Sequence, residues 1–220
     1  MTSLQKWGKS VRTTIPVMAG YLVLGAGFGI LLRTRGYGLG WALAMSAFIY
    51  AGSMQYVAID LLTGGASLLT TAVTTLLVNA RHLFYGISML ERYRAAGKYA
   101  PYLIFSLTDE TYSLVAARED LTGAECFRIS LLDQLYWVLG TALGSLAGAY
   151  LDFNTTGIDF SLTALFLTVF TEQWLETKNH APALIGLGVS IVCRLLFGAD
   201  SFLLPTMGGM LCCLLVLDAR

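Results

Sequence analysis

The sequence predicts an all-α protein that crosses a membrane several times, with six to eight membrane helices or half-helices. Hydrophobic residues make up 56% of the 220 residues and charged residues 13%, about half the charged share of ordinary soluble domains. A soluble domain of this length needs more polar residues to cover its surface. The 14 Lys and Arg residues balance the 14 Asp and Glu residues, so no basic face predicts a nucleic-acid partner.

Long intervals without a charged residue are the most direct evidence for membrane helices. About 20 residues of α-helix cross a hydrocarbon core roughly 30 Å thick. Helices are required because lipid offers the backbone no hydrogen-bond partners, and the apolar segments do not alternate as barrel strands do. The intervals that can each hold a spanning helix are residues 13–32, 36–59, 61–80, 134–151 and 201–217.

Three weaker stretches are apolar apart from one polar site each. Each is either a span with a polar centre or a half-helix buried among other helices. Counting them with the five intervals, we expect the whole chain, 1–220, to form a single transmembrane domain. The stretches are residues 101–117 with Asp109 and Glu110, residues 160–175 with Glu172, and residues 183–198 with Arg194.

The N-terminus carries basic residues before the first apolar run, as a signal peptide does. Lys6, Lys9 and Arg12 lie there, but no A-x-A-like cleavage site follows before the next helix. We therefore interpret the segment as an uncleaved first helix. Its charges favour a cytoplasmic N-terminus, whereas the basic residues of later loops indicate no consistent orientation.

The two halves of the chain share three features in the same order, which predicts an internal two-fold repeat over residues 15–90 and 129–198. Residues 101–117 then form a polar-centred linking helix. Many secondary transporters contain such repeats, with a substrate site near the midplane where broken helices meet. The repeats are inverted if residues 101–117 do not cross the membrane and parallel if they do. The matched features are residues 53–56 (Ser-Met-Gln-Tyr) with 171–174 (Thr-Glu-Gln-Trp), Gly25 and Gly29 with Gly144 and Gly148, and residues 81–84 (Arg-His-Leu-Phe) with 194–197 (Arg-Leu-Leu-Phe).

The sequence predicts no metal, no cofactor and no enzyme. The four cysteines lack the spacing of metal ligands, and structural metal sites need such sets. No GxxxxGK[ST] phosphate loop is present, which argues against an ATPase. His82 and His180 are the only imidazoles available to a hydrolytic site.

A first polar cluster lies in residues 50–56, Tyr-Ala-Gly-Ser-Met-Gln-Tyr, inside the longest charge-free interval. Gly52 lacks a Cβ and can let the helix break, which frees backbone groups to hold a ligand. Ser53 and Gln55 can hydrogen-bond a ligand, or they can join helices through interhelical hydrogen bonds. Both interpretations stay open.

A second cluster, Asn79, Arg81 and His82, lies at the C-terminal end of the interval 61–80. Arg81 can hold a carboxylate through two parallel hydrogen bonds, the grip that an amino-acid substrate requires. Its alternative is to extend toward lipid headgroups. His82 can relay protons, because imidazole changes its charge near neutral pH, or it can be a structural histidine.

A third cluster covers residues 106–113 and contains Asp109 and Glu110 in an otherwise apolar stretch. A charge within the bilayer costs a few kcal/mol, so these carboxyls are candidate proton carriers. Alternatively, Thr108 or Asp109 caps a helix whose first turn contains Glu110. Both interpretations can hold together, because the N-terminus of a half-helix is itself an anion site.

A fourth cluster is related to the first by the predicted repeat and contains Glu172, Gln173, Trp174 and Arg194. Glu172 and Arg194 can pair across two helices. The glycines of the chain have a structural interpretation. Gly25-x-x-x-Gly29 and Gly140-x-x-x-Gly144-x-x-x-Gly148 place small residues on one helix face, which permits close helix packing.

The polar segments together resemble the AzlC family. The resemblance lies in residues 50–56, in residues 79–86 (Asn-Ala-Arg-His-Leu-Phe-Tyr-Gly), in residues 107–111 (Leu-Thr-Asp-Glu-Thr) and in the glycine-rich run from Gly20 to Gly29. It covers most of residues 15–115. The family is known as the large subunit of bacterial branched-chain amino acid exporters, which work with a small hydrophobic AzlD-type subunit.

The resemblance implies a multi-pass subunit of the bacterial inner membrane that exports leucine, isoleucine, valine and analogues, without a cofactor. In this scheme helices broken near Gly52 and Thr108 present backbone dipoles to the substrate, and the proton gradient drives export. Alternatives are a transporter or channel for another solute, and a subunit inactive without its small partner. The expected substrate-binding residues are Gly52, Ser53, Gln55, Asn79, Arg81, Thr108 and Gln173, and the expected proton-coupling residues are Asp109, Glu110 and His82.

Overall fold

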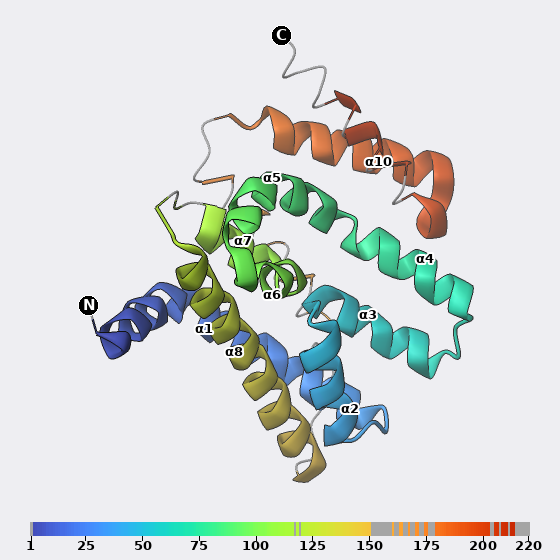
Figure 1. The fold of residues 1–220 in the computed structure, drawn as a ribbon. Coiled ribbons are helices and arrows are strands. Elements are labelled where there is room, and N and C mark those ends of the chain that lie inside the picture. Colours follow the sequence, from blue (N-terminus) through green and yellow to red (C-terminus); the bar gives the residue numbers. More distant parts are fainter. Residues whose placement is uncertain are drawn as a thin grey trace. The chain divides into compact units, whose positions relative to one another are not determined.

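The protein is helical throughout the part of the chain that its computed structural model describes, where no strand occurs (Figure 1). That part divides into two compact units, Met1–Leu162 and Thr163–Arg220, each described by itself. The described residues are 2–116, 118, 120–150, 160, 163–164, 167, 170–171, 174–175, 179–202, 205–206, 208–210 and 212–213.

Helix α1, Ser3–Thr34, occupies the first predicted span. Its start is fixed by a capping box, in which the Thr2 hydroxyl accepts from the Gln5 backbone N–H and the Gln5 side chain accepts from the Thr2 backbone N–H. These bonds satisfy backbone donors that have no partner within the helix. After Thr34 the chain turns at Gly36, whose φ of 91° suits glycine.

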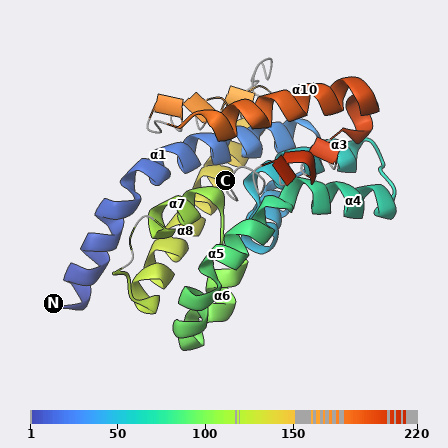
Figure 2. The same ribbon diagram turned by 90° about the horizontal axis from the view of Figure 1, so that it is seen from above.

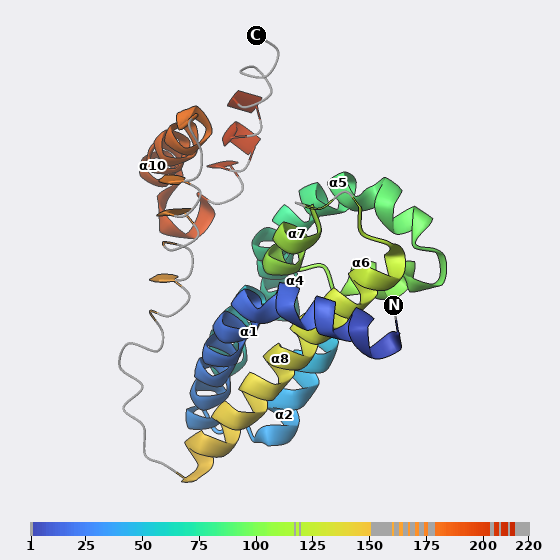
Figure 3. The ribbon, with the colours of Figure 1, turned by 90° about the vertical axis from the view of Figure 1, so that its left-hand side faces the viewer.

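Helix α8, Gly123–Tyr150, lies beside α1 and runs in the same direction (Figures 1 and 3). Arg128 donates to Ser10 at the start of the pair, and Gly148 lies against Ile30 at its end. A Cβ on Gly25 would lie 2.9 Å from the backbone oxygen of Trp137. The glycine motifs therefore allow close backbone contact between these two helices, as predicted.

The second charge-free interval does not form one spanning helix, so that expectation was wrong. Helix α2, Leu39–Ala44, passes into the π-helix η1, Met45–Ile49, and α3 starts anew at Gly52 and ends at Thr63. Between them Tyr50 is left-handed, with φ 43° and ψ 47°. Left-handed backbone is costly for a residue with a Cβ and interrupts the helix. The break predicted near Gly52 is therefore present.

The interval 61–80 is also not a single helix. Gly64 and Gly65 end α3, and Ser67 caps α4, Leu68–Asn79, by accepting from the Thr70 N–H. At 12 residues, α4 is about 18 Å long and too short to cross the hydrocarbon core. Helix α5, Arg81–Ala95, follows after Ala80, and Figure 2 shows the bend between the two helices.

The described part of the stretch 101–117, residues 101–116, forms two short helices instead of one span. After the 3₁₀ turn η2, Gly97–Tyr99, helix α6 covers Ala100–Phe105 and helix α7 covers Asp109–Ala116. The predicted break near Thr108 lies between them. Thr108 caps α7, because its hydroxyl accepts from the Thr111 backbone N–H at 3.3 Å. The half-helix interpretation of this stretch is the one that the structure supports.

Two clusters of buried side chains hold the first unit together. One joins α1, η1, α3 and α8 around Phe28, Ile59 and Trp137. The other joins α5, α6, α7 and α8 around Leu103, Val115 and Ile129.

The second unit contains helix α10, Ala181–Ser201, in which Gly198 has φ 75°. Among the described residues, two helices are long and apolar enough to cross a membrane, at Leu4–Thr34 and Ala181–Gly198. Leu39–Ile49 and Leu68–Asn79 are shorter apolar helices. The number of six to eight crossing elements therefore stays a prediction, and the stretches 160–175 and 201–217 are described only in part.

The duplication also stays a prediction. The matched glycines of its two halves pack against each other, since a Cβ on Gly29 would lie 3.1 Å from the carbonyl carbon of Gly144. The residues matched with Met54 and Gln55 are Glu172 and Gln173, which lie outside the described residues.

Candidate functional site

Arg81 joins the first turns of three helices. As the first residue of α5, it donates from Nη2 to the Ser53 hydroxyl in the first turn of α3, at 2.5 Å. Its Nη1 forms an ion pair of 2.9 Å with Asp109 Oδ2, at the start of α7. Helix N-termini carry partial positive charge. The carboxylate of Asp109 therefore balances the positive charge of Arg81 and of the three helix starts that meet here.

This ion pair is accessible, because the side chains of Arg81 and Asp109 are 27% and 32% exposed. Asp109 Oδ1 is itself buried and accepts no hydrogen bond within the described structure. A guanidinium and a carboxylate side by side are complementary to the carboxylate and ammonium groups of a zwitterion. Two of the residues predicted to bind substrate, Ser53 and Arg81, contact each other directly.

Gly52 lies at a close approach between helices. A Cβ built on it would lie 3.0 Å from a ring carbon of Trp137, so a side chain at this position would push against the indole of α8. The requirement for glycine here comes from packing, because Gly52 is not among the residues with positive φ.

Gln55 is fully buried and both polar atoms of its amide are bonded to protein groups. Its Oε1 accepts from Trp137 Nε1 at 2.9 Å, and its Nε2 donates to the Ser46 hydroxyl at 3.1 Å. Ser46 in turn donates to Thr141 at 3.0 Å. These bonds connect η1, α3 and α8, so they favour the interhelical interpretation of Gln55 over direct contact with a ligand.

Trp137→Phe is expected to lower the stability of the purified protein by about 1–3 kcal/mol, because the Gln55 oxygen loses its donor inside the fold. Thermal unfolding in detergent measures this. Trp41→Phe is the matched control, since Trp41 is 55% exposed and the same substitution there removes no buried hydrogen bond. Equal melting temperatures for the two variants would contradict the importance of the Trp137–Gln55 bond.

Asn79 and His82 line an apolar pocket of about 650 Å³. His82 Nδ1 lies 3.1 Å from the backbone oxygen of Asn79, and its ring contacts Tyr85 edge to face. The Asn79 side-chain oxygen is buried and accepts no hydrogen bond within the described structure. The other lining residues come from α4, α5, the residue between them, α6 and the turn after α6. They are Thr75, Leu76, Ala80, Leu83, Gly86, Ile87, Leu90, Tyr93, Arg94, Ala100, Ile104 and Leu107.

Thr108 and Glu110 belong to a buried polar network behind the ion pair. The Tyr21 hydroxyl of α1 donates to Glu110 Oε2 at 2.7 Å and lies 2.7 Å from the Thr108 hydroxyl. Thr108 donates to the Thr111 hydroxyl at 3.1 Å, and Thr111 donates to Asp133 Oδ2 of α8 at 2.8 Å. The two adjacent acids therefore have different partners, with Asp109 bound to Arg81 and Glu110 to Tyr21.

Asp133 was not among the predicted site residues, although it is fully buried. In the sequence it served only as the boundary of the charge-free interval 134–151. The structure places it well inside α8. The signal that points to it is the apolar run on both sides, Ile129-Ser130-Leu131-Leu132 before it and Leu135-Tyr136-Trp137 after it.

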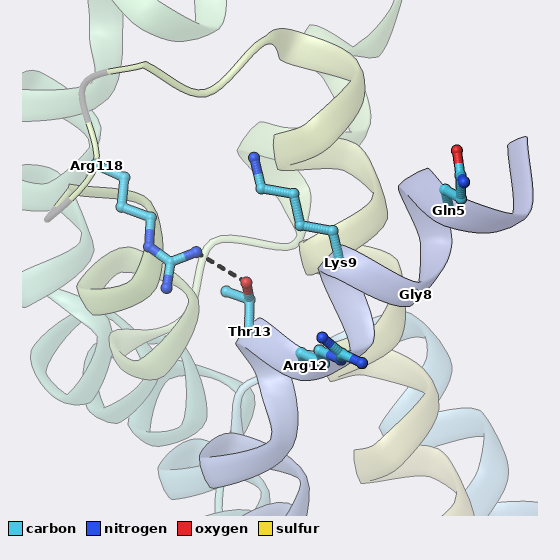
Figure 4. Close-up of a pocket in the computed structure, with 6 residues that line it drawn as sticks. All are labelled: Gln5, Gly8, Lys9, Arg12, Thr13 and Arg118. Atoms are coloured by element: carbon cyan, nitrogen blue, oxygen red, sulfur yellow. Dashed lines mark hydrogen bonds between the residues drawn. The ribbon is translucent and has the colours of Figure 1, made fainter. Parts of the chain in front are cut away.

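A second pocket, of about 590 Å³, lies near the start of α1 and collects basic side chains (Figure 4). Lys9, Arg12 and Arg118 line it, and Arg118 donates to the Thr13 hydroxyl at 2.8 Å. Gln5 and Gly8 complete its wall. It contains none of the residues predicted to bind substrate. Gln173, which was predicted to bind substrate, lies outside the described residues.

Comparison with known proteins identifies the family. The family model described as AzlC protein matches residues 16–151. The branched-chain amino acid transport protein AzlC of Bacillus subtilis is 46% identical over 209 residues, which cover 93% of this chain and 82% of that protein. An uncharacterized membrane protein of Helicobacter pylori is 45% identical, over 87% of this chain and 86% of its own length.

A more distant relative is the inner membrane protein YgaZ of Escherichia coli, 26% identical over 80% of this chain and 77% of that protein. No solved structure matches the chain. The relatives are described as membrane or transport proteins, which agrees with a helical protein whose polar side chains gather around interrupted helices. With its family model matched over residues 16–151 and a relative 46% identical over most of both lengths, the chain belongs to the AzlC family.

Proposed function

We propose that the chain is a subunit of a secondary transporter that exports leucine, isoleucine, valine and analogues across the bacterial inner membrane. The observation that carries this proposal is the accessible Arg81–Asp109 ion pair among the starts of α3, α5 and α7. Each partner can exchange its bond for one to a zwitterionic substrate, Arg81 to the carboxylate and Asp109 to the ammonium group. The B. subtilis relative, named a branched-chain amino acid transport protein, supports the substrate class.

The apolar pocket beside Asn79 and His82 is the proposed place of the aliphatic side chain. Its volume of about 650 Å³ is within the range of small-molecule sites, which are mostly apolar with a few polar groups. Leucine, isoleucine and valine differ by about one methylene, so a pocket of this kind separates them only weakly. We therefore expect transport of all three.

The remaining predicted residues support this site in different ways. Gly52 and Thr108 lie at the two helix breaks, where first-turn N–H groups favour an anion. Gln55 acts through Trp137, by holding α3 against α8. Gln173 stays proposed as a second orienting amide on the basis of the repeat alone.

Glu110 is the proposed proton-coupling carboxyl, with His82 and Asp109 as the other candidates. Arg81 compensates the charge of Asp109 directly, whereas the hydrogen-bond partner of Glu110 is the neutral Tyr21 hydroxyl. A carboxyl without a paired cation is the better proton carrier, because its charge is the more costly one in an apolar surrounding. A small AzlD-type subunit is proposed as partner for full activity.

Leucine efflux from preloaded cells that lack their own exporters tests the function. Cells that express the chain with the AzlD-type subunit are expected to release leucine, isoleucine and valine, but not lysine, and a protonophore is expected to stop this release. Expression of the chain alone tests whether the partner is needed. Release of other solutes without branched-chain amino acids would favour a transporter for another substrate and contradict the proposal.

Glu110→Gln is expected to abolish the gradient-driven part of leucine efflux while exchange of internal for external leucine continues, because exchange needs no net proton movement. Asp109→Asn is expected to abolish both, because it removes the proposed ammonium partner. Both variants should reach the membrane. Glu91→Gln is the matched control, an exposed carboxyl of α5, and should behave as wild type. Unchanged gradient-driven efflux in Glu110→Gln would remove Glu110 from the coupling scheme.

A further inference from the structure

Asp133 is a buried carboxyl that has no role in the transport cycle proposed above. It is fully buried in the middle of α8, and its Oδ2 accepts from the Thr111 hydroxyl. Its Oδ1 accepts no hydrogen bond within the described structure. Among the described residues the ion pairs are Lys9–Glu125 and Arg81–Asp109, so no basic side chain compensates Asp133.

An uncompensated carboxylate at such a place is costly. Removing an ion from water costs several kcal/mol even after the protein relaxes, and one neutral hydroxyl donor offsets only part of that. A carboxyl group held this way is stable when it carries a proton or faces a cation. The ionisable groups that interact with it are Glu110 of α7, Tyr50 between η1 and α3, and Tyr102 of α6, none of which is cationic.

A continuous chain of hydroxyl groups connects Asp133 to Glu110. Its links are Glu110 to Tyr21 at 2.7 Å, Tyr21 to Thr108 at 2.7 Å, Thr108 to Thr111 at 3.1 Å and Thr111 to Asp133 at 2.8 Å. Every link is within hydrogen-bond distance. Tyr21, Thr108 and Thr111 are buried, so the path from one carboxyl to the other is shielded from solvent.

Two hydroxyls along this chain, those of Tyr21 and Thr108, can point either way, because either of them can be the donor in the bond between them. Tyr21 gives its hydrogen to Glu110, and Thr111 gives its hydrogen to Asp133. Both carboxyls therefore receive a bond when ionised. The Thr108 hydroxyl lies between Tyr21 and Thr111 and can donate to either. Thr108 is held there by the helix break, since it caps α7.

We propose that Asp133 is a second proton site, connected to Glu110 by the hydroxyls of Tyr21, Thr108 and Thr111. When Glu110 takes up a proton, its O–H donates to the Tyr21 oxygen, and the Tyr21 hydrogen turns from Glu110 to Thr108. The Glu110 proton then passes to the Tyr21 oxygen, and Tyr21 releases its own proton to Thr108. Thr108 passes its proton to Thr111, and Thr111 passes its proton to Asp133 Oδ2. Each hydroxyl gains one O–H bond and loses one. The net result is an ionised Glu110 and a protonated Asp133, with the proton supplied by bulk water at the half-buried Glu110.

The role of this relay in export rests on the proposed function, but the protonation of Asp133 does not. Infrared difference spectra of the purified protein in detergent, recorded against pH, report buried carboxylic acids through their C=O stretching band. Asp133→Asn is expected to lose one such band. Glu91→Gln, which alters an exposed carboxyl, should keep it. A spectrum unchanged by Asp133→Asn would show that Asp133 carries no proton and would overturn the proposal.

The relay itself is tested at Thr111, which contacts Asp133 without being a carboxyl. Thr111→Val removes the hydroxyl link with little change in volume, and Thr111→Ser keeps it. Gradient-driven leucine efflux is expected to be lost in Thr111→Val and retained in Thr111→Ser, while leucine exchange continues in both. Equal gradient-driven efflux in the two variants would overturn the relay.

Two further results separate this proposal from its alternatives. Asp133→Asn is expected to keep leucine exchange and lose gradient-driven efflux, whereas loss of exchange as well would assign Asp133 to substrate binding and overturn its role as a proton site. If the wild-type protein transports no branched-chain amino acid, the proposed function fails, and the infrared experiment still decides whether Asp133 is a proton site.

Discussion

Arg81→Gln is expected to abolish leucine transport in both the efflux and the exchange assay. The guanidinium is the only group that connects Asp109 with Ser53 in the described structure, and its removal leaves Asp109 as an uncompensated charge. Breaking a buried pair by removing one partner costs about 3–5 kcal/mol, and the half-exposed position of this pair reduces that cost. Loss of stability therefore has to be separated from loss of the substrate site.

The neutral double variant Arg81→Gln/Asp109→Asn makes this separation. It leaves no unpaired charge, so its melting temperature should return close to that of the wild type. Transport should stay absent, because neither the carboxylate nor the ammonium group of the substrate has its partner. Recovery of transport in the double variant would show that the pair is purely structural and would contradict the proposed site.

Arg81→Lys completes this series. Lysine restores the positive charge but lacks the planar fork with which arginine bonds two groups at once. We expect near-normal stability and leucine transport at least about tenfold slower, a difference that corresponds to about 1.4 kcal/mol. Wild-type transport by Arg81→Lys would indicate that a point charge is sufficient.

Gly29→Ala is expected to lower the stability of the folded protein strongly. A Cβ at Gly29 would meet the backbone oxygen of Thr141 and lie 2.6 Å from the Ser145 nitrogen. Backbone atoms cannot rotate away as a side chain does, so α1 and α8 have to separate. Overpacking of this kind costs about 1–3 kcal/mol or more. The measurement is the melting temperature and the yield of monodisperse protein in detergent.

Gly20→Ala is the matched control, because it lies in the same helix and nothing lies within 4 Å of the Cβ that it would add. In a helix interior, alanine is favoured over glycine by about 1 kcal/mol, so this variant should be as stable as the wild type or more stable. A similar loss in both variants would show that helix packing at Gly29 is not the cause.

The helical membrane class and the polar segments could be predicted from the sequence, because both depend on local composition. Apolar runs indicate membrane helices whatever their partners are, and the glycine spacing correctly predicted that small residues allow close packing. The breaks near Gly52 and Thr108 were also predicted. Continuous helices over 36–59 and 61–80 were wrong, because hydropathy does not register a left-handed residue such as Tyr50 or a turn at Gly64 and Gly65.

The assignment of partners was decided only by the tertiary structure. Asp109 and Glu110 are neighbours in sequence with the same chemistry, yet one is bound to Arg81 of α5 and the other to Tyr21 of α1. Asp133 was taken only as the boundary of an interval, and its connection to Thr111 depends on how α7 packs against α8. Composition determines which side chains are costly to bury in an apolar medium. Helix packing determines which group compensates each of them, because hydrogen bonds and ion pairs act over a few ångströms between residues far apart in the chain.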